Sequence, residues 1–169
     1  MSKTYSDADL EVRLWSEIRK SHFGMLAAPS DDFARQCAPM TAFPEPIEKT
    51  LWFFTSNESD LTRAAGDGGA EAVFVFQSKD QDLHACLSGR LHLSRDKERI
   101  DRYWSAQVAA WYKNGKKDPN LAMLRFDVAE AQVWLSETGP LKYAWEILKG
   151  NLTAATPDIG EHVRFEMRH

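Results

Sequence analysis

The chain opens with hydrophobic positions that follow a helical period. Leu10, Leu14 and Ile18 recur every four residues, and charged residues lie between them. This pattern predicts an amphipathic helix over about 7–20 with one buried stripe. Ser6 and Asp9 match a capping box, so the helix is expected to begin at the serine.

Short strand-like segments follow. The runs rich in apolar, aromatic or β-branched residues lie at 23–28, 35–43, 50–55, 72–77, 121–128 and 131–135. The run 72–77 is apolar on both faces, which predicts a central strand covered on both sides. Residues 83–94 alternate strictly between apolar and polar side chains, which indicates a long strand with one buried face. Gly89 within this strand predicts a bulge or a bend.

Helical patterns occur only at a few other places. Asn57 is expected to cap a short helix over 58–65, and residues 97–112 predict a helix broken near Ser105. Pro140 suits the first turn of a last helix over 140–150. The tail, 151–169, is compatible with disorder or with an arm that docks on a partner.

The order of these elements predicts an antiparallel α+β fold. Strands follow one another without helices between most pairs, unlike the alternation of a parallel sheet. A length of 169 residues fits one domain, with a barrel core over about 22–137 and peripheral helices at its start, middle and end.

Composition excludes several classes of protein. The formal net charge of -4 gives no support to nucleic-acid binding. The amino terminus lacks a signal-peptide pattern, and no apolar run approaches the roughly 18 residues of a membrane span. We therefore expect a soluble cytoplasmic protein that does not bind membranes. Cys37 and Cys86 are expected to be free thiols, and the sequence assigns neither a redox role.

The motifs of several catalytic classes are missing. The sequence has no G-x-G-x-x-G, no P-loop and no G-x-S-x-G. His84 and His92 share a strand face but lie roughly 26 Å apart, so no metal site and no catalytic residue is predicted. Trp134 lies among polar neighbours, which favours a ligand contact or a subunit contact. The turn between the strand 51–55 and its helix is a weak candidate for anion binding.

Five short motifs, taken together, resemble one family. They are LWFFT at 51–55 followed by Ser59, CAPM at 37–40, LSG at 87–89, WYKNGKKDP at 111–119 and AQVW at 131–134. Over roughly 14–150 the chain resembles the flavin-binding split barrels of the pyridoxamine-phosphate-oxidase-like superfamily, and most closely its general-stress-protein branch.

The resemblance implies a six-stranded antiparallel split barrel that binds FMN at the interface of a homodimer and acts as an FMN-dependent oxidoreductase. The implied cofactor-binding residues are Ala38, Pro39 and Met40 beside the flavin, Phe54, Thr55 and Ser56 along its ring and ribityl chain, Ser59, Asp60 and Leu61 in the phosphate turn, Arg63 as a nearby cation, and Trp111 and Trp134 as ring contacts from the interface.

The chain departs from the branch at the phosphate. Ala38 replaces the arginine before Pro-Met, and Asp60 and Leu61 replace a basic pair. Arg35 and Arg63 are candidates to compensate, because a phosphate favours charge-assisted donors. The alternative is therefore a dimeric barrel with a degenerate flavin site, which binds another planar ligand such as heme or deazaflavin or has no catalytic role. A true pyridoxamine-phosphate oxidase is less favoured, because no basic groups for a second phosphate are evident.

Overall fold

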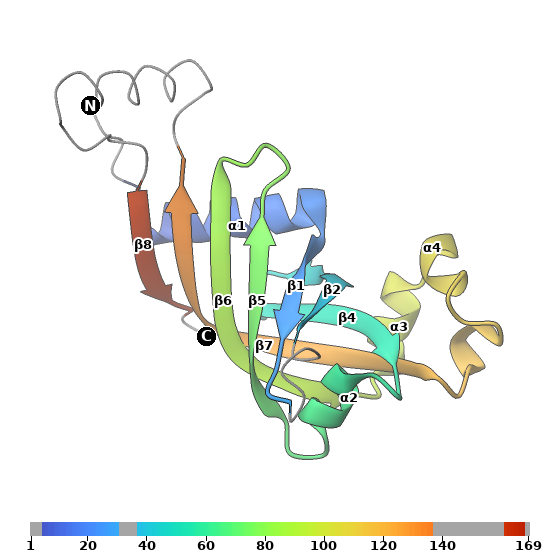
Figure 1. The fold of residues 1–169 in the computed structure, drawn as a ribbon. Coiled ribbons are helices and arrows are strands. Elements are labelled where there is room, and N and C mark those ends of the chain that lie inside the picture. The colour runs from blue at the N-terminus through green and yellow to red at the C-terminus, as the bar shows by residue number, and fades with distance from the viewer. Residues whose placement is uncertain (1–4, 31–36, 137–160, 168–169) are drawn as a thin grey trace, which may run out of the picture.

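A computed structural model describes residues 5–30, 37–136 and 161–167 (Figure 1). In chain order, the elements are α1 (Asp7–Ser21), β1 (Phe23–Ala27), β2 (Cys37–Thr41), β3 (Phe43–Glu45), β4 (Thr50–Ser56), α2 (Asp60–Ala65), β5 (Ala70–Gln77), β6 (Leu83–Ser94), α3 (Lys97–Tyr103), α4 (Ala106–Ala109), the 3-10 turn η2 (Gly115–Lys117), β7 (Leu121–Leu135) and β8 (Glu161–Glu166).

The strands form one strongly curved antiparallel sheet. Its order is β2-β1-β5-β6-β7-β4-β3, and β8 pairs with β7 away from this path. The first part of β7 pairs with β4 and the last part with β8, while β6 lies along its other edge. Figure 1 shows β6 and β7 bending together, so that the sheet curls into a half-open barrel. The predicted α+β split barrel is confirmed, although the described residues contain eight strands rather than six.

Gly89 allows the bend of β6. The register between β6 and β7 shifts between Ser88 and Gly89, as expected at a bulge. A Cβ atom on Gly89 would lie 2.0 Å from the carbonyl oxygen of Asp127. The bulge predicted from the sequence is confirmed, and only glycine fits the close approach of the two backbones.

The bulge also explains a wrong prediction. The sequence predicts two strands over 121–128 and 131–135, whereas the structure has the single strand β7. Ser88 pairs with Glu130 and Gly89 with Val128, so Ala129 is an extra residue within a continuous ladder. The chain therefore bends at this point without leaving the sheet.

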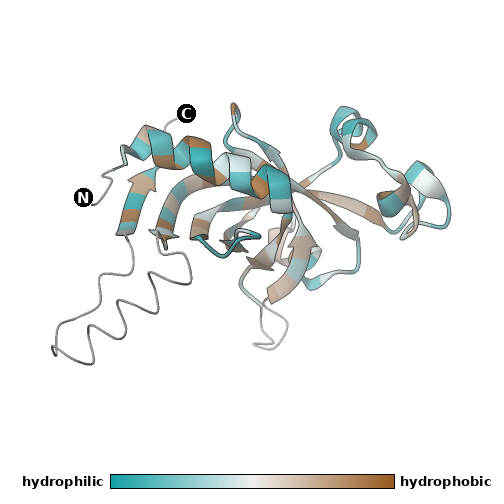
Figure 2. Cartoon of the chain, turned by 90° about the horizontal axis from the view of Figure 1, so that it is seen from above, coloured by the Kyte–Doolittle hydropathy of each residue, from teal (hydrophilic) through white to brown (hydrophobic). Residues whose placement is uncertain are grey.

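Helix α1 packs one stripe against the sheet. Leu10, Leu14 and Ile18 are fully buried there, and the predicted capping box between Ser6 and Asp9 is present. In Figure 2, α1 alternates between hydrophilic and hydrophobic residues along its length. Burial of the apolar stripe supplies most of the free energy that holds such a helix in place.

The other helices differ in detail from the predictions. Ser59, not Asn57, caps α2, because its hydroxyl accepts from the Thr62 N–H at 3.1 Å. The predicted break near Ser105 is confirmed, since this residue separates α3 from α4 and caps α4. The predicted helix over 140–150 lies outside the described residues. Within the ambiguous tail, β8 adds a strand to the sheet.

The outer face of β5 is less covered than predicted. Phe74 and Phe76 are buried, but Val75 between them is 49% exposed. Its neighbour across the ladder, Met25 of β1, is 40% exposed. The expectation of a strand covered on both faces is therefore wrong for the single chain, because no described element packs over this face.

Within the described part of the chain, no helix has the length and apolar character that a membrane crossing requires.

Candidate ligand-binding cleft

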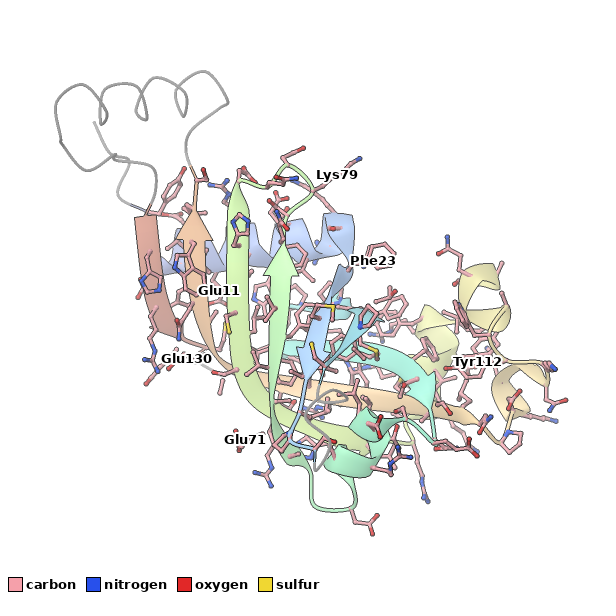
Figure 3. All side chains as sticks on the ribbon, in the orientation of Figure 1. Glu11, Phe23, Glu71, Lys79, Tyr112 and Glu130 are labelled. Carbon is pink, nitrogen blue, oxygen red and sulfur yellow. The ribbon has the colours of Figure 1, made fainter. Side chains whose placement is uncertain are left out.

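A cleft of about 800 Å³ lies beside the curved sheet, between the ends of β1, β2 and β4 and the region of α4. Its lining consists of His22, Phe23, Pro39, Met40, Thr41, Phe43, Phe54, Thr55, Ser56, Ser105, Gln107, Val108, Trp111, Tyr112 and Asn120. Figure 3 shows Phe23 and Tyr112, from segments far apart in the sequence, on the side of the sheet where α3 and α4 lie. The volume lies within the range of typical small-molecule sites, roughly 300–1,000 Å³.

The structure brings six of the twelve implied cofactor-binding residues to this cleft. They are Pro39, Met40, Phe54, Thr55, Ser56 and Trp111. They come from β2, from the end of β4 and from the turn after α4. The segments CAPM and LWFFT are 11 residues or more apart in sequence, and the sheet places both at the same cleft.

The remaining six do not line it in this chain. Ala38 packs against the core, and the side chain of Leu61 is buried within it. Ser59 caps α2 as described above. Asp60 and Arg63 form an ion pair with each other, and Arg63 also donates to the carbonyl of Glu58 at 2.5 Å. Their charges are therefore directed to neighbours on the same turn.

Trp134 lies at the opposite end of β7 from the cleft. Its ring stacks on that of His162 in β8, with ring centroids 4.7 Å apart and planes inclined by 11°. Leu121, at the cleft end of β7, precedes it by 13 residues, or roughly 40 Å of strand. Within one chain, Trp134 therefore does not reach the cleft, and only a second copy could bring it there.

One wall of the cleft is aromatic. The Phe43 ring stacks on Tyr103 with centroids 4.8 Å apart and contacts Phe54 edge-on at 5.8 Å. Phe54 in turn contacts Trp104 at 6.0 Å. Stacked and edge-on rings stabilise one another beyond the area they bury. The four rings form one connected cluster, of which Phe43 and Phe54 line the cleft.

The wall is tied to the sheet by Tyr112. Its hydroxyl donates to the carbonyl of Thr55 at 2.8 Å, which joins the segment after α4 to the end of β4. Burial, and then the negative charge of Asp118, raises the pKa of Tyr112 to about 12. The phenol is therefore neutral at ordinary pH and stays a hydrogen-bond donor.

A second anchor holds α3. The carboxylate of Glu45 in β3 accepts from the Tyr103 hydroxyl at 2.5 Å and pairs with Arg99 at 3.0 Å and Arg102 at 3.1 Å. Burial, and then the hydrogen bond to Glu45, raises the pKa of Tyr103 to about 12. We call these four residues the α3 clamp. It fixes the ring of Tyr103, against which Phe43 stacks.

The turn after β4 uses many of its own donors. The Asn57 N–H donates to the carbonyl of Asn120 at 2.9 Å, and the Glu58 N–H donates to Oγ of Ser56 at 3.1 Å. The Ser59 N–H donates to the Ser56 carbonyl at 3.0 Å. These three backbone groups are engaged within the protein, which reduces what the turn offers an anion.

The cleft fits the ring of a flavin better than its phosphate. Among the described lining residues there is no lysine and no arginine; hydroxyl and amide groups supply the polar contacts. Arg35 lies outside the described residues. The same part of the chain holds no group of three or more His, Cys, Asp or Glu side chains placed to bind a metal ion. The expected absence of a metal site remains a prediction.

Sequence reasoning did not single out several lining residues. His22, Phe43 and Gln107 carry no motif, and their role depends on which side of an element they occupy. Tyr112 could have been predicted as a lining residue, because it belongs to the motif at 111–119 that contains Trp111. Thr41 directly follows the CAPM motif and extends it into the cleft.

Comparison with known families assigns the chain to one of them. The family described as "Pyridoxamine 5'-phosphate oxidase like" matches residues 9–158. The protein belongs to this family. The resemblance inferred from the five motifs is thereby confirmed, and the match covers most of the chain, including every described residue of the cleft.

Comparison with solved structures agrees with this family assignment. A protein assigned as general stress protein 26 from Jannaschia sp. CCS1 is 31% identical, with a TM-score of 0.77 over 95% of this chain and 99% of that one. The general stress FMN/FAD binding protein of Xanthomonas citri is 37% identical, with a TM-score of 0.71 over 78% of this chain and 92% of that one. A general stress family protein from Xanthomonas campestris is 34% identical, with a TM-score of 0.71 over 80% and 93%. No curated protein matches the chain.

Proposed function

We propose that the protein binds FMN in the cleft and is a flavin-dependent oxidoreductase of the general-stress type. The observation that carries the proposal is the meeting of two motifs at one cleft: Pro39 and Met40 of β2 face the same space as Phe54–Ser56 of β4. The likeness to the FMN/FAD binding protein of Xanthomonas citri supports it.

The residues of the cleft have definite tasks in this proposal. A bound flavin supplies the electron or hydride transfer itself, so the protein need only bind, orient and shield it. Phe54, which the Phe43 ring contacts edge-on, excludes water and packs against a planar ring. The hydroxyls of Thr55 and Ser56 are placed to hydrogen bond with a polar tail.

We further propose a homodimer. The exposed row of Met25 and Val75 gives β1 and β5 an apolar outer face, and Phe23 at the edge of the cleft is 69% exposed. Apolar faces of this kind mark interfaces in soluble proteins. A second copy packed on this face would place its own residues near the cleft, which is the position that the resemblance implies for Trp134.

The flavin is tested by titration. FMN is added to the purified protein, and quenching of its fluorescence and the visible spectrum are recorded. Trp111, which is 84% exposed and lines the cleft, is replaced in Trp111→Ala. We expect this variant to bind FMN roughly fivefold more weakly, because a ring contact contributes about 1 kcal/mol.

Ile47→Ala is the matched control, since Ile47 is 96% exposed and lies outside the cleft. Its affinity should equal that of the wild type. A colourless protein that leaves FMN fluorescence unchanged would overturn the assignment.

A second candidate is a ligand-binding barrel that has lost FMN. The pairing of Asp60 with Arg63 and the engaged N–H groups of Asn57, Glu58 and Ser59 favour it, because a phosphate dianion needs free or charged donors. Under this function the wild type does not quench FMN, yet heme or a deazaflavin binds and Trp111→Ala weakens that binding.

A further inference from the structure

His22 is held in the cleft by contacts on two sides. It ends α1 with a backbone φ of 62°, and its N–H donates to the carbonyl of Ile18 at 2.8 Å. Its own carbonyl accepts from the N–H of Ala42 at 2.7 Å, and its ring Nδ1 lies 2.9 Å from the carbonyl of Ala42. The backbone and the ring of His22 are therefore both fixed on one residue.

The contact with Ala42 determines which ring nitrogen of His22 donates a hydrogen bond and which can accept one. A carbonyl oxygen only accepts, so Nδ1 must carry the proton. In the neutral ring, Nε2 is then a hydrogen-bond acceptor. No described residue forms a hydrogen bond with Nε2, and His22 lines the cleft. A ligand in the cleft can therefore meet an oriented acceptor.

Capping alone does not explain a histidine at this position. A left-handed residue at the end of a helix is usually glycine or asparagine, because a larger side chain is strained there. Strained residues in folded proteins cluster at functional sites. His22 adopts this left-handed conformation and lines the cleft.

An aromatic side chain of the cleft lining, Phe43, lies next to this acceptor. The Phe43 ring is 6.2 Å from that of His22 and 5.8 Å from that of Phe54, so it continues the aromatic wall to the histidine. The hydroxyls of Tyr103 and Tyr112, on the same wall, already donate to Glu45 and to the Thr55 carbonyl. His22 therefore adds an imidazole acceptor to the hydroxyl and amide groups that line the cleft.

We propose that the His22 end of the cleft is a substrate subsite for a planar ring that carries an O–H or N–H group. The ring packs on Phe43, and the O–H or N–H donates to Nε2 of His22. The substrate role rests on the proposed flavin function, whereas the binding preference is a property of the cleft alone. The chemical class is thus a phenol or a nitrogen analogue of one, and not an ether or a plain hydrocarbon.

The experiment compares two naphthalene probes, one with an O–H donor and one in which a methyl group replaces the hydroxyl hydrogen. Binding of 2-naphthol and of 2-methoxynaphthalene to the full chain is measured by equilibrium dialysis. We expect about fivefold tighter binding of 2-naphthol, the effect of one neutral hydrogen bond. Equal affinities, tighter binding of the ether, or no binding of either probe would overturn the proposal in the wild type, without any variant.

His22→Asn assigns the preference to the ring nitrogen. Asparagine tolerates the left-handed conformation and its side-chain amide can still donate to Ala42, so the helix end is retained. It has no counterpart of Nε2, and the preference should fall below twofold. The matched control His84→Asn replaces an exposed histidine of β6 and should keep the preference. A preference that persists in His22→Asn contradicts the assignment.

FMN titration of the same proteins separates the two proposals. If the wild type binds no FMN but prefers 2-naphthol through His22, the flavin function fails and the subsite stands. If FMN binds and the probes bind equally, the flavin function stands and the subsite is wrong.

Discussion

At Gly89 the backbones of β6 and β7 approach so closely that no side chain fits between them. The position a Cβ would take is 2.0 Å from Asp127 O and 3.1 Å from the N of Ala129. Both neighbours are backbone atoms, which cannot move aside without breaking the ladder. One hydrogen atom in place of a methyl group thus permits the bend on which the barrel depends.

Gly89→Ala should therefore lower the free energy of unfolding by about 3 kcal/mol, the upper part of the range for overpacked sites. Urea unfolding followed by circular dichroism measures it. Gly68→Ala is the control, because a Cβ on Gly68 would have no heavy atom within 4 Å and the backbone there is not left-handed. Its effect should stay within about 0.5 kcal/mol. Similar values for the two variants would show that the close approach at Gly89 is not costly.

Polar contacts hold α3 in place. None of its side chains is fully buried and Tyr103 is half-buried, so the hydrophobic effect contributes less to holding it than it does for α1. The α3 clamp replaces that contribution: the Glu45 side chain is only 10% exposed and receives two guanidinium groups and a phenol. The position of α3 then sets the position of Tyr103, and with it the aromatic wall.

Glu45→Gln removes the charge that Arg99 and Arg102 share and keeps the shape of the side chain. We expect a loss of about 2 kcal/mol in the free energy of unfolding, since hydrogen bonds to charged groups each contribute about 1.5–3 kcal/mol and some are retained. Chemical denaturation measures the loss. Glu98→Gln, whose side chain is 74% exposed, also removes a partner of Arg102 but should cost less than about 0.5 kcal/mol. Equal costs would mean that the clamp acts as an ordinary surface pair.

On the scale of the whole molecule, the sheet has one covered and one open face. Helix α1 and the core cluster cover the inner face, while Met25 and Val75 remain exposed on the other. Burying such a row against a second copy would remove apolar surface from water at about 25 cal/mol per Å². The dimer that we propose follows from this open face.

Val75→Glu should convert the protein to a monomer, because a carboxylate in an apolar interface loses its hydration without a partner. Light scattering coupled to size-exclusion chromatography gives the mass, for which one chain is 19.2 kDa. Val12→Glu on α1 is the control, since Val12 is 71% exposed and lies on the outward side of the helix. It should leave the mass of a dimer unchanged. A wild type that elutes as a monomer, or a Val75→Glu dimer, would contradict the proposed interface.

Local patterns predicted the elements well. The stripe of α1, the alternation of β6 and the bulge at Gly89 depend on spacing along one segment, and the structure has all three. The merging of β7 and the capping of α2 by Ser59 were not predicted, because several local choices were compatible with the same residues. The five motifs together identified the family, because their combined order and spacing are more specific to it than any one motif is.

The sequence by itself determined the α+β class, the positions of most strands along the chain and the family, because these depend on burial periodicity and on motif spacing within the chain. Only the tertiary structure decided which side chains share the cleft. It placed His22 and Phe43 in the same cleft as the predicted Phe54 and paired Arg63 with Asp60. Trp134 lies at the end of β7 opposite the cleft. These outcomes depend on distances between segments far apart in sequence, and such distances are fixed by how the sheet curves.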